Sequence, residues 1–212
     1  MRRDSNNSPH LLAVAILAAG ASSRMGQAKL LLPWGATSVL GHQISIWQLL
    51  GAGQIGVVCA ARDDAIQAEL DRLGFPPQNR ILNQRPEDEM FSSIRCASGW
   101  DGWRAGLTHW TITLGDQPHL RLETLQAVVE LSAGEPEKIC QPRRLGHLRH
   151  PVIMPKSLFQ HLKDARVSTL KEFLAGREIA SCEVDDPGLD LDIDEPEDYK
   201  KALALLVEQQ PK

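Results

Sequence analysis

A continuous apolar run near the start of the chain constrains the fold more than any other feature of the sequence. Residues Leu11 to Ala19 read LLAVAILAA and are followed by Gly20. A run of this length without polar alternation is typical of a strand buried on both faces of a parallel sheet. It is too short to span a bilayer, which takes about 20 residues. The run therefore predicts a buried strand of an α/β domain, and we expect no membrane partner.

Alternating strand and helix patterns follow this run along the chain. Such alternation requires crossover connections and predicts an open, mostly parallel sheet in three α/β/α layers, a Rossmann-like arrangement. We expect residues 1–10 to form a disordered N-terminal tail and residues 11–209 to form a single domain, because 212 residues suit one core. Further strands are predicted at 54–60, 80–83, 110–114, 138–142 and 178–184, with a short extended piece at 150–155 and helices at 39–50, 63–74, 91–100, 121–134, 156–165, 168–176 and 195–209.

Charge and cysteine usage exclude several classes of function. The net charge is −4, which provides no basic field for nucleic acid, so we expect no nucleic-acid partner. The four cysteines are scattered without the spacing of a zinc site or a disulfide framework. Reduced thiols of this kind are typical of a cytoplasmic protein.

The loop after the first strand, AAGASSRMGQAK, is rich in small residues and ends in basic ones. Small side chains let backbone N–H groups approach a phosphate chain closely, and consecutive N–H groups can form an anion-binding nest. Arg24 and Lys29 would add fixed positive charge. The alternative is an ordinary strand-to-helix turn with solvated basic residues, because small-residue loops are common.

Two carboxylate-bearing segments are candidates for a metal site. Asp116 directly follows the apolar strand TITL, at the edge of the sheet where ligands bind, and Mg²⁺ prefers carboxylate oxygens. The alternative is a turn aspartate that bonds to its own backbone. If the segment DLDID is extended, Asp190, Asp192 and Asp194 share one face, and Asp192 or Asp194 could supply a second metal contact. Asp194 also reads as the N-cap of the last helix.

The loop resembles the signature of the nucleotidyltransferase superfamily. Within that superfamily the resemblance is greatest to the molybdenum cofactor cytidylyltransferases and the related guanylyltransferases, the MobA-like NTP transferases. It extends to LLPWG, GDQPHL, HPVIMP and LDIDEPEDY, in the family's order, and covers residues 11 to 205. The loop positions that match are Ala18, Gly20, Ser22, Arg24, Met25, Gly26 and Lys29.

This resemblance implies the nucleotidyltransferase fold and a transferase of molybdenum cofactor biosynthesis. The implied reaction transfers CMP, or GMP, from CTP or GTP to the phosphate of molybdopterin and releases pyrophosphate, with Mg²⁺ as cofactor. A molybdoenzyme or its chaperone is a further implied partner. The implied catalytic residues are Arg24, Lys29 and Asp116, and the implied metal ligands are Asp116 and Asp194. The implied nucleotide-binding residues are Leu17, Ala18, Ala19, Gly20, Arg24, Lys29, Asn83 and Ser93, and the implied acceptor-binding residues are Arg149 and His150.

Departures from the family pattern leave alternatives open. Family members often carry glycine where this chain has Glu89, and Gly-His-Pro where it has Arg149, His150 and Pro151. Asn83 could instead shape a turn, and Ser92 or Ser93 could cap a helix. Arg149 and its basic neighbours could be a solvated turn. Two other functions are consistent with the sequence, namely transfer to a sugar or polyol phosphate, and nucleotide binding without turnover as a partner in molybdoenzyme maturation.

Overall fold

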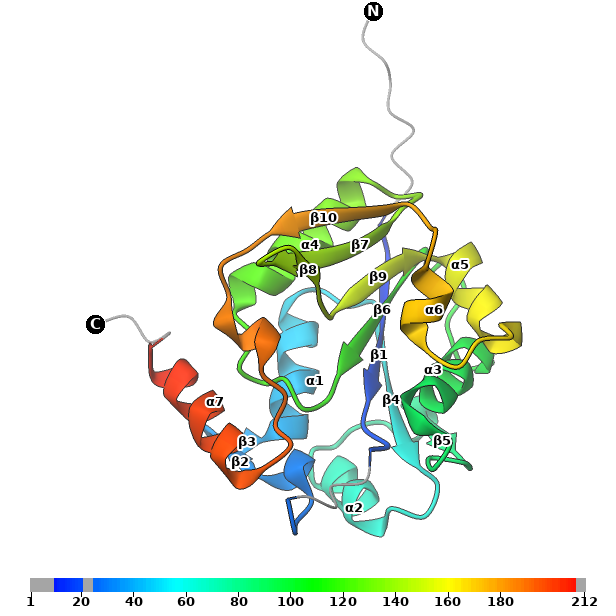
Figure 1. The fold of residues 1–212 in the computed structure, drawn as a ribbon. Helices are drawn as coiled ribbons and strands as arrows, with labels where there is room; N and C mark the ends of the chain where they lie inside the picture. Colours follow the sequence, from blue (N-terminus) through cyan, green and yellow to red (C-terminus); the bar gives the residue numbers. More distant parts are fainter. Residues whose placement is uncertain (1–9, 21–24, 209–212) are drawn as a thin grey trace, which may run out of the picture.

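The computed structural model describes residues 10–20 and 25–208, and they form a central sheet between two layers of helices (Figure 1). In these residues the main sheet has eight strands, ordered β10-β7-β9-β6-β1-β4-β5 with β8 beside β7. The predicted three-layer, mostly parallel α/β fold is therefore confirmed. The strands are β1 Leu12–Leu17, β4 Gln54–Ala60, β5 Arg80–Asn83, β6 His109–Leu114, β7 Ile139–Arg144, β8 His147–Leu148, β9 Val152–Pro155 and β10 Ile179–Glu183.

The helices divide between the two faces of the sheet. One hydrophobic cluster joins the sheet to α1, α2, α4 and α7, and the other joins it to α3, α5 and α6. Figure 1 shows α3, α5 and α6 on the opposite side of the sheet from α1, α4 and α7. The helices are α1 Val39–Leu49, α2 Asp64–Arg72, α3 Glu89–Gly99, α4 Leu122–Gly134, α5 Lys156–His161, α6 Leu170–Leu174 and α7 Pro196–Glu208. None of the helices described is long and apolar enough to cross a membrane.

The strand predicted from the apolar run lies in the middle of the sheet. β1 pairs in parallel with β4 on one side and with β6 on the other. Leu12, Val14 and Ile16 belong to one hydrophobic cluster, and Ala13 and Ala15 belong to the other. Burial of both faces explains why the run contains no polar residue.

Antiparallel pairing in one half of the sheet was not predicted. The short extended segment becomes β9, which runs antiparallel to both β6 and β7. A small hairpin of β2 Pro33–Trp34 and β3 Thr37–Ser38 was also missed, as was β8. Strands of two residues are too short to show a period-2 pattern, so the sequence carries no signal for them.

The segment that carries three aspartates is not extended throughout, so that prediction is wrong. Pro187–Asp190 forms a 3-10 turn, with Asp186 as its N-cap, and the chain straightens only after it. Asp190 therefore does not share a face with Asp192 and Asp194 through simple alternation. The helix α7 begins at Pro196, and Asp198 reaches back to accept a hydrogen bond from the N–H of Glu195 at 3.1 Å.

The strand order places a topological switch point between β1 and β6. The chain leaves β1 toward β4 and β5 on one side, then returns to form β6 on the other side. Ligands of open α/β sheets bind beside the carboxyl ends of the strands at such a point.

Of the predicted N-terminal tail, residues 1–10, the structure describes only His10. The imidazole ring of His10 lies beside that of His109, with 4.3 Å between the two ring centroids.

Candidate active site

The carboxyl ends of β1 and β6 lie in direct contact at the switch point. The N–H of Gly115 donates to the carbonyl oxygen of Leu17 at 3.0 Å. A Cβ atom on residue 115 would lie 2.7 Å from that same oxygen, so only glycine fits there. This close approach fixes Asp116, the next residue, beside the end of β1.

Lys29 joins two of the predicted metal carboxylates. It begins the 3-10 turn Lys29–Leu31, and its Nζ donates to Asp116 Oδ2 at 2.5 Å and to Asp194 Oδ1 at 2.9 Å. Burial lowers the pKa of Lys29, but the attraction of Asp116 and Asp194 outweighs it, and the pKa is raised above its ordinary value. The ammonium therefore stays charged and holds three distant parts of the chain together.

A third carboxylate increases the negative charge at this point. Asp192 Oδ1 accepts a hydrogen bond from Gln117 Nε2 at 2.8 Å. Burial raises the pKa of Asp192, and the charges of Asp116 and Asp194 raise it further. Three carboxylates thus share one small region, although among the described residues no three acidic, histidine or cysteine side chains form a ready metal cage.

The predicted phosphate-binding loop is described only at its two ends. Leu17, Ala18 and Ala19 leave the end of β1, and Ala18 donates from its N–H to the carbonyl of Val58 at 2.7 Å. Gly20 is exposed. Arg24, a predicted catalytic and nucleotide-binding residue, lies outside the described residues. Lys29, at the far end of the loop, reaches the carboxylates.

The two residues predicted to bind nucleotide after β5, Asn83 and Ser93, lie together at the carboxyl end of that strand. Asn83 Nδ2 donates to Ser92 Oγ at 2.8 Å and to Ser93 Oγ at 3.0 Å. Asn83 Oδ1 accepts from the N–H of Arg85 at 2.9 Å, so its side chain does shape a turn. The alternative that a serine caps α3 is wrong, because the helix begins at Glu89, before both serines. A cavity of about 680 Å³ opens beside this turn.

The backbone at Glu89 explains why family members often carry glycine at this position. Glu89 has a φ of 61°, in the left-handed region that glycine adopts without strain. Arg149, the other departure, is not among the residues with positive φ. Glycine is therefore favoured by the backbone at position 89 but not at position 149.

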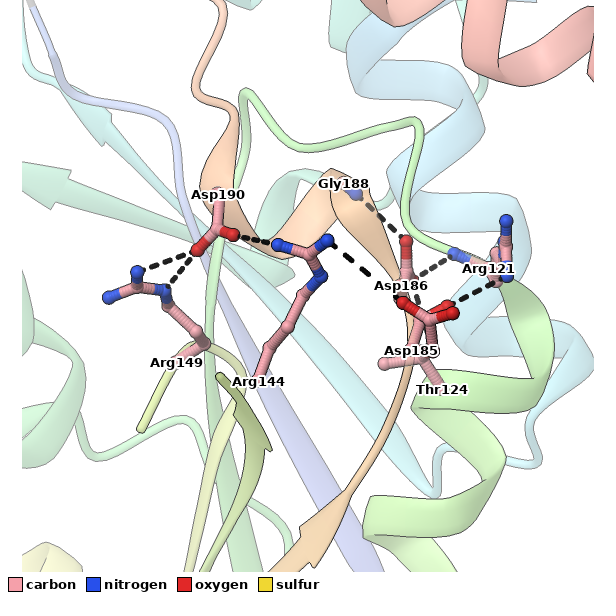
Figure 2. A network of polar contacts seen from close by, with 8 residues as sticks. All are labelled: Arg121, Thr124, Arg144, Arg149, Asp185, Asp186, Gly188 and Asp190. Carbon is pink, nitrogen blue, oxygen red and sulfur yellow. Dashed lines mark hydrogen bonds and ion pairs between the residues drawn. The ribbon is translucent and has the colours of Figure 1, made fainter. Parts of the chain in front are cut away.

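The predicted acceptor residues line a larger cavity of about 970 Å³, which reaches from Gln117 and Asp192 to α6. Arg149 donates from Nε and Nη2 to Asp190 Oδ1 at 2.9 and 2.6 Å, and Arg144 bonds the other oxygen of that carboxylate (Figure 2). Burial lowers the pKa of His150, which lies against the carbonyl of Ile112. The basic turn is thus tied to Asp190 and is more than a solvated surface.

Several residues that hold this site were missed at the level of sequence. Asp186 accepts from the N–H of Arg121 at 2.9 Å, from Thr124 Oγ1 at 2.8 Å and from the N–H of Gly188 at 2.9 Å (Figure 2). His119 Nε2 donates to the carbonyls of Gly188 and Leu191 at 3.1 and 2.9 Å. Both tie the aspartate-bearing segment to the loop after Asp116. In the sequence, His119 lies in GDQPHL and Asp186 lies in VDDPG. Their closeness to Asp116 and to the three aspartates was the signal that could have identified them.

Comparisons with known proteins find relatives that match nearly the whole chain. Among curated proteins, the chain is 27% identical over 187 residues to the molybdenum cofactor cytidylyltransferase of Escherichia coli, covering 87% of this chain and 91% of that protein. It is 29% identical over 203 residues to the purine catabolism protein PucB of Bacillus subtilis, covering 91% and 95%. It superimposes on the crystal structure of Rv0371c from Mycobacterium tuberculosis with a TM-score of 0.74 and 22% identity, covering 92% of this chain and 98% of that one.

The family model for the MobA-like NTP transferase domain matches residues 14–181. That range contains most of β1, the switch point, Asn83, Asp116 and the basic turn, and it covers well over half of the chain. The chain belongs to the family of MobA-like NTP transferase domains and is a nucleotidyltransferase of that family.

Proposed function

We propose that this protein transfers CMP, or less favourably GMP, from the nucleoside triphosphate to the phosphate of molybdopterin in molybdenum cofactor maturation. A phosphate oxygen of the acceptor attacks the α-phosphorus, the bond from that phosphorus to the β-phosphate oxygen breaks, and pyrophosphate leaves. The observation that carries this proposal is the bridge from Lys29 to Asp116 and Asp194 at the switch point. Reactions of this kind depend on positioning and charge neutralisation, which such a bridge can supply.

The nucleotide would lie across the ends of β1 and β5. The backbone from Leu17 to Gly20, with Arg24 and Lys29, would hold the triphosphate, and the Asn83–Ser93 turn would frame the base. Lys29 would exchange part of its contact with the two carboxylates for contact with phosphate oxygens. An ammonium on a flexible stem suits such an exchange.

Asp116 and Asp194 are the residues that would hold Mg²⁺. Their oxygens are the ligands that this ion prefers, and magnesium in nucleotide sites is usually held by one or two carboxylates together with substrate phosphates. Burial, and after it the charges of Asp116 and Asp194, raise the pKa of Asp192, and a cation at this point would offset the negative charge that the carboxylates share. When bound, the ion would neutralise charge that develops on the phosphates. A divalent metal also fits the manganese complex of the Mycobacterium tuberculosis protein.

The acceptor would enter the 970 Å³ cavity, whose volume lies in the range of small-molecule sites. Arg149 and His150 line it, and guanidinium groups bind phosphate oxygens well. The similarity to the Escherichia coli cytidylyltransferase over most of both chains supports molybdopterin as the acceptor. We propose a cytoplasmic location, with a molybdoenzyme or its chaperone as the recipient of the product.

A sugar or polyol phosphate is the second candidate acceptor. The GlmU protein of Corynebacterium diphtheriae is 28% identical over 141 residues, although the match covers only 28% of that protein. A CMP-2-keto-3-deoxy-manno-octonic acid synthetase solved with CTP superimposes with a TM-score of 0.72. A synthetase that acts on a sugar acid therefore has the same fold as this chain.

The test is pyrophosphate release by the purified protein with Mg²⁺, each of the four NTPs and either molybdopterin or a panel of sugar phosphates. We expect release with molybdopterin and CTP, with GTP as the next donor. Release only with sugar phosphates would show that the acceptor is a sugar phosphate and not molybdopterin. Asp116→Asn should abolish turnover, whereas Asp71→Asn, at an exposed ion pair with Arg80, should not. Normal turnover in the Asp116 variant would remove its proposed role.

A further inference from the structure

The acceptor cavity has a buried polar lining that the transfer chemistry leaves unexplained. Gln117 and Gln141 both line this cavity and are only 4% and 5% exposed. Each uses its amide nitrogen within the protein, Gln141 to the carbonyl of Arg149 at 3.0 Å and Gln117 to Asp192 at 2.8 Å. Over the described parts of the chain, neither amide oxygen accepts a hydrogen bond.

The orientation of the Gln141 amide follows from its partner. A backbone carbonyl can only accept, so the NH₂ group of Gln141 must face Arg149, and the oxygen must point away from it. Arg149 is itself fixed, because its N–H donates to the carbonyl of Pro142 at 3.0 Å. An amide oxygen held in this way cannot turn to find another partner, and a buried polar atom without one costs about 1–3 kcal/mol.

The rest of the cavity lining restricts what can satisfy that oxygen. Leu114, Val152 and Ile179 provide apolar surface, while Arg143 and Arg149 provide positive charge. A flat ring can place its faces on the apolar surface and its N–H edge on the amide oxygen, and an anionic tail can reach the guanidinium groups. A sugar has no flat apolar faces and suits this lining less well.

We propose that Gln141 Oε1 accepts a hydrogen bond from the exocyclic amino group of a flat nitrogen heterocycle in the acceptor, and thereby determines acceptor specificity. This inference rests on the proposed function in placing the acceptor in this cavity. It adds the residue that distinguishes an amino-substituted ring from one with oxygen at the same position. With oxygen there, two acceptors would face each other across the contact, which is unfavourable.

The first experiment compares two fluorescent probes, pterin-6-carboxylate and its 2-oxo counterpart lumazine-6-carboxylate, in the absence of nucleotide. The wild-type protein should bind the pterin about tenfold more tightly, as the loss of one hydrogen bond would give. Gln141→Met should reduce that ratio to about one, since it keeps the length of the side chain and removes the oxygen. Equal binding of both probes by the wild type, or an unchanged ratio in the variant, would overturn the proposal.

Gln54→Met is the matched control. Gln54 is also a buried strand glutamine, but its amide nitrogen donates to Asn79 and Gly102 and its oxygen accepts from the N–H of Arg104. It should keep the tenfold ratio. If Gln141→Met does not fold, as judged by its thermal melt, Gln141→Leu provides the second variant. It also lacks the amide oxygen and should lose the preference for the pterin, and an unchanged preference would contradict the proposal.

Turnover with molybdopterin separates this inference from the proposed function. If the protein releases no pyrophosphate with any NTP but its probe ratio depends on Gln141, the proposed function fails and this inference stands. If molybdopterin is turned over and Gln141→Met leaves both KM and the probe ratio unchanged, the function stands and this inference fails. The expected result is a KM for molybdopterin raised about tenfold with kcat nearly constant, because the contact lies away from the reacting phosphate.

Discussion

Lys29 Nζ lies 2.5 Å from Asp116 Oδ2, although 87 positions separate the two residues in the sequence. A second hydrogen bond, at 2.9 Å, joins the same nitrogen to Asp194. Both carboxylates thus accept a hydrogen bond from the same ammonium, and Asp192 adds its charge to the same region. The loop after β1, the end of β6 and the segment before α7 therefore form one electrostatic unit.

Lys29→Met should disable this unit. The variant removes the ammonium that two partly buried carboxylates share, so we expect the free energy of unfolding to fall by about 1–3 kcal/mol. Turnover should fall by about 100-fold or more, because a fixed positive charge at the transferred phosphate is lost. Lys201→Met removes a lysine from an exposed pair with Asp198 and should match the wild type in both measurements. Wild-type turnover in the Lys29 variant would contradict its role.

Gly115→Ala should displace Asp116 without changing any charge. The added Cβ would lie 2.7 Å from the carbonyl oxygen of Leu17, so the ends of β1 and β6 must separate. We expect the free energy of unfolding to fall by about 1–3 kcal/mol and turnover to fall with it. Gly134→Ala is the control, because open space surrounds that position at the end of α4, and it should stabilise the protein by about 0.5–1 kcal/mol. Equal changes in the free energy of unfolding of the two variants, measured by urea titration, would refute the steric argument.

Much of the part of this site that is proposed to bind the nucleotide could be predicted from the sequence. β4 begins and ends where its apolar run predicts, because a strand buried on both faces leaves a local signal. Asp116 follows a recognisable strand, and the switch-point rule places it beside the end of β1. Asn83 and Ser93, both predicted to bind nucleotide, lie only ten residues apart, and Asn83 Nδ2 donates to Ser93 Oγ.

The acceptor side could not be predicted in this way, because its geometry depends on pairing between distant segments. The direction of β9 sets where Gln141 and Arg149 meet, and no local pattern indicates that a four-residue strand runs antiparallel between two others. The turn at Pro187–Asp190 likewise depends on the contacts of Asp186 with α4. Asp190, which ends this turn, and the two aspartates after it therefore looked like an alternating strand.

Glu89→Gly should stabilise the protein. Residue 89 has a φ of 61°, which costs an L-residue about 1–2 kcal/mol, whereas the greater flexibility of glycine when unfolded costs about 0.5–1 kcal/mol. We expect a net gain of about 0.5–1 kcal/mol in the free energy of unfolding, measured by urea titration. Asp88→Gly, at a φ of −81°, should instead lower it. A lower stability for both variants would mean that the left-handed backbone at Glu89 carries no strain.

Acid should destabilise the protein through the neighbouring rings of His10 and His109. Burial lowers the pKa of His10 from its ordinary 6.5 to about 4, and His109 adds to this. Below pH 6.5 the unfolded chain therefore binds a proton that the folded protein resists, so stability falls from pH 6.5 to about 4 and then levels off. His10 is only half-buried, so after allowance for screening we expect about 1–2 kcal/mol. His10→Gln should reduce this dependence of the free energy of unfolding on pH. Identical curves of unfolding free energy against pH for the variant and the wild type would refute the role of His10.

Asp186→Ala should disorganise the acceptor cavity, whereas the same change at its neighbour Asp185 should have little effect. Asp186 is 1% exposed and accepts three hydrogen bonds that tie the turn before Asp190 to the start of α4 (Figure 2). Its removal leaves buried donors without partners, so we expect a loss of about 2–4 kcal/mol in the free energy of unfolding.

Because that turn positions the carboxylate that holds Arg144 and Arg149, Asp186→Ala should also raise the KM for the acceptor more than the KM for the nucleotide. Asp185→Ala provides the control, since its side chain is 99% exposed and approaches Arg144 only to 4.0 Å. It should change stability by less than about 0.5 kcal/mol and leave both KM values unaltered. A rise in the KM for nucleotide alone in the Asp186 variant would show that the segment serves the donor side, and equal behaviour of the two variants would remove the anchoring role of Asp186.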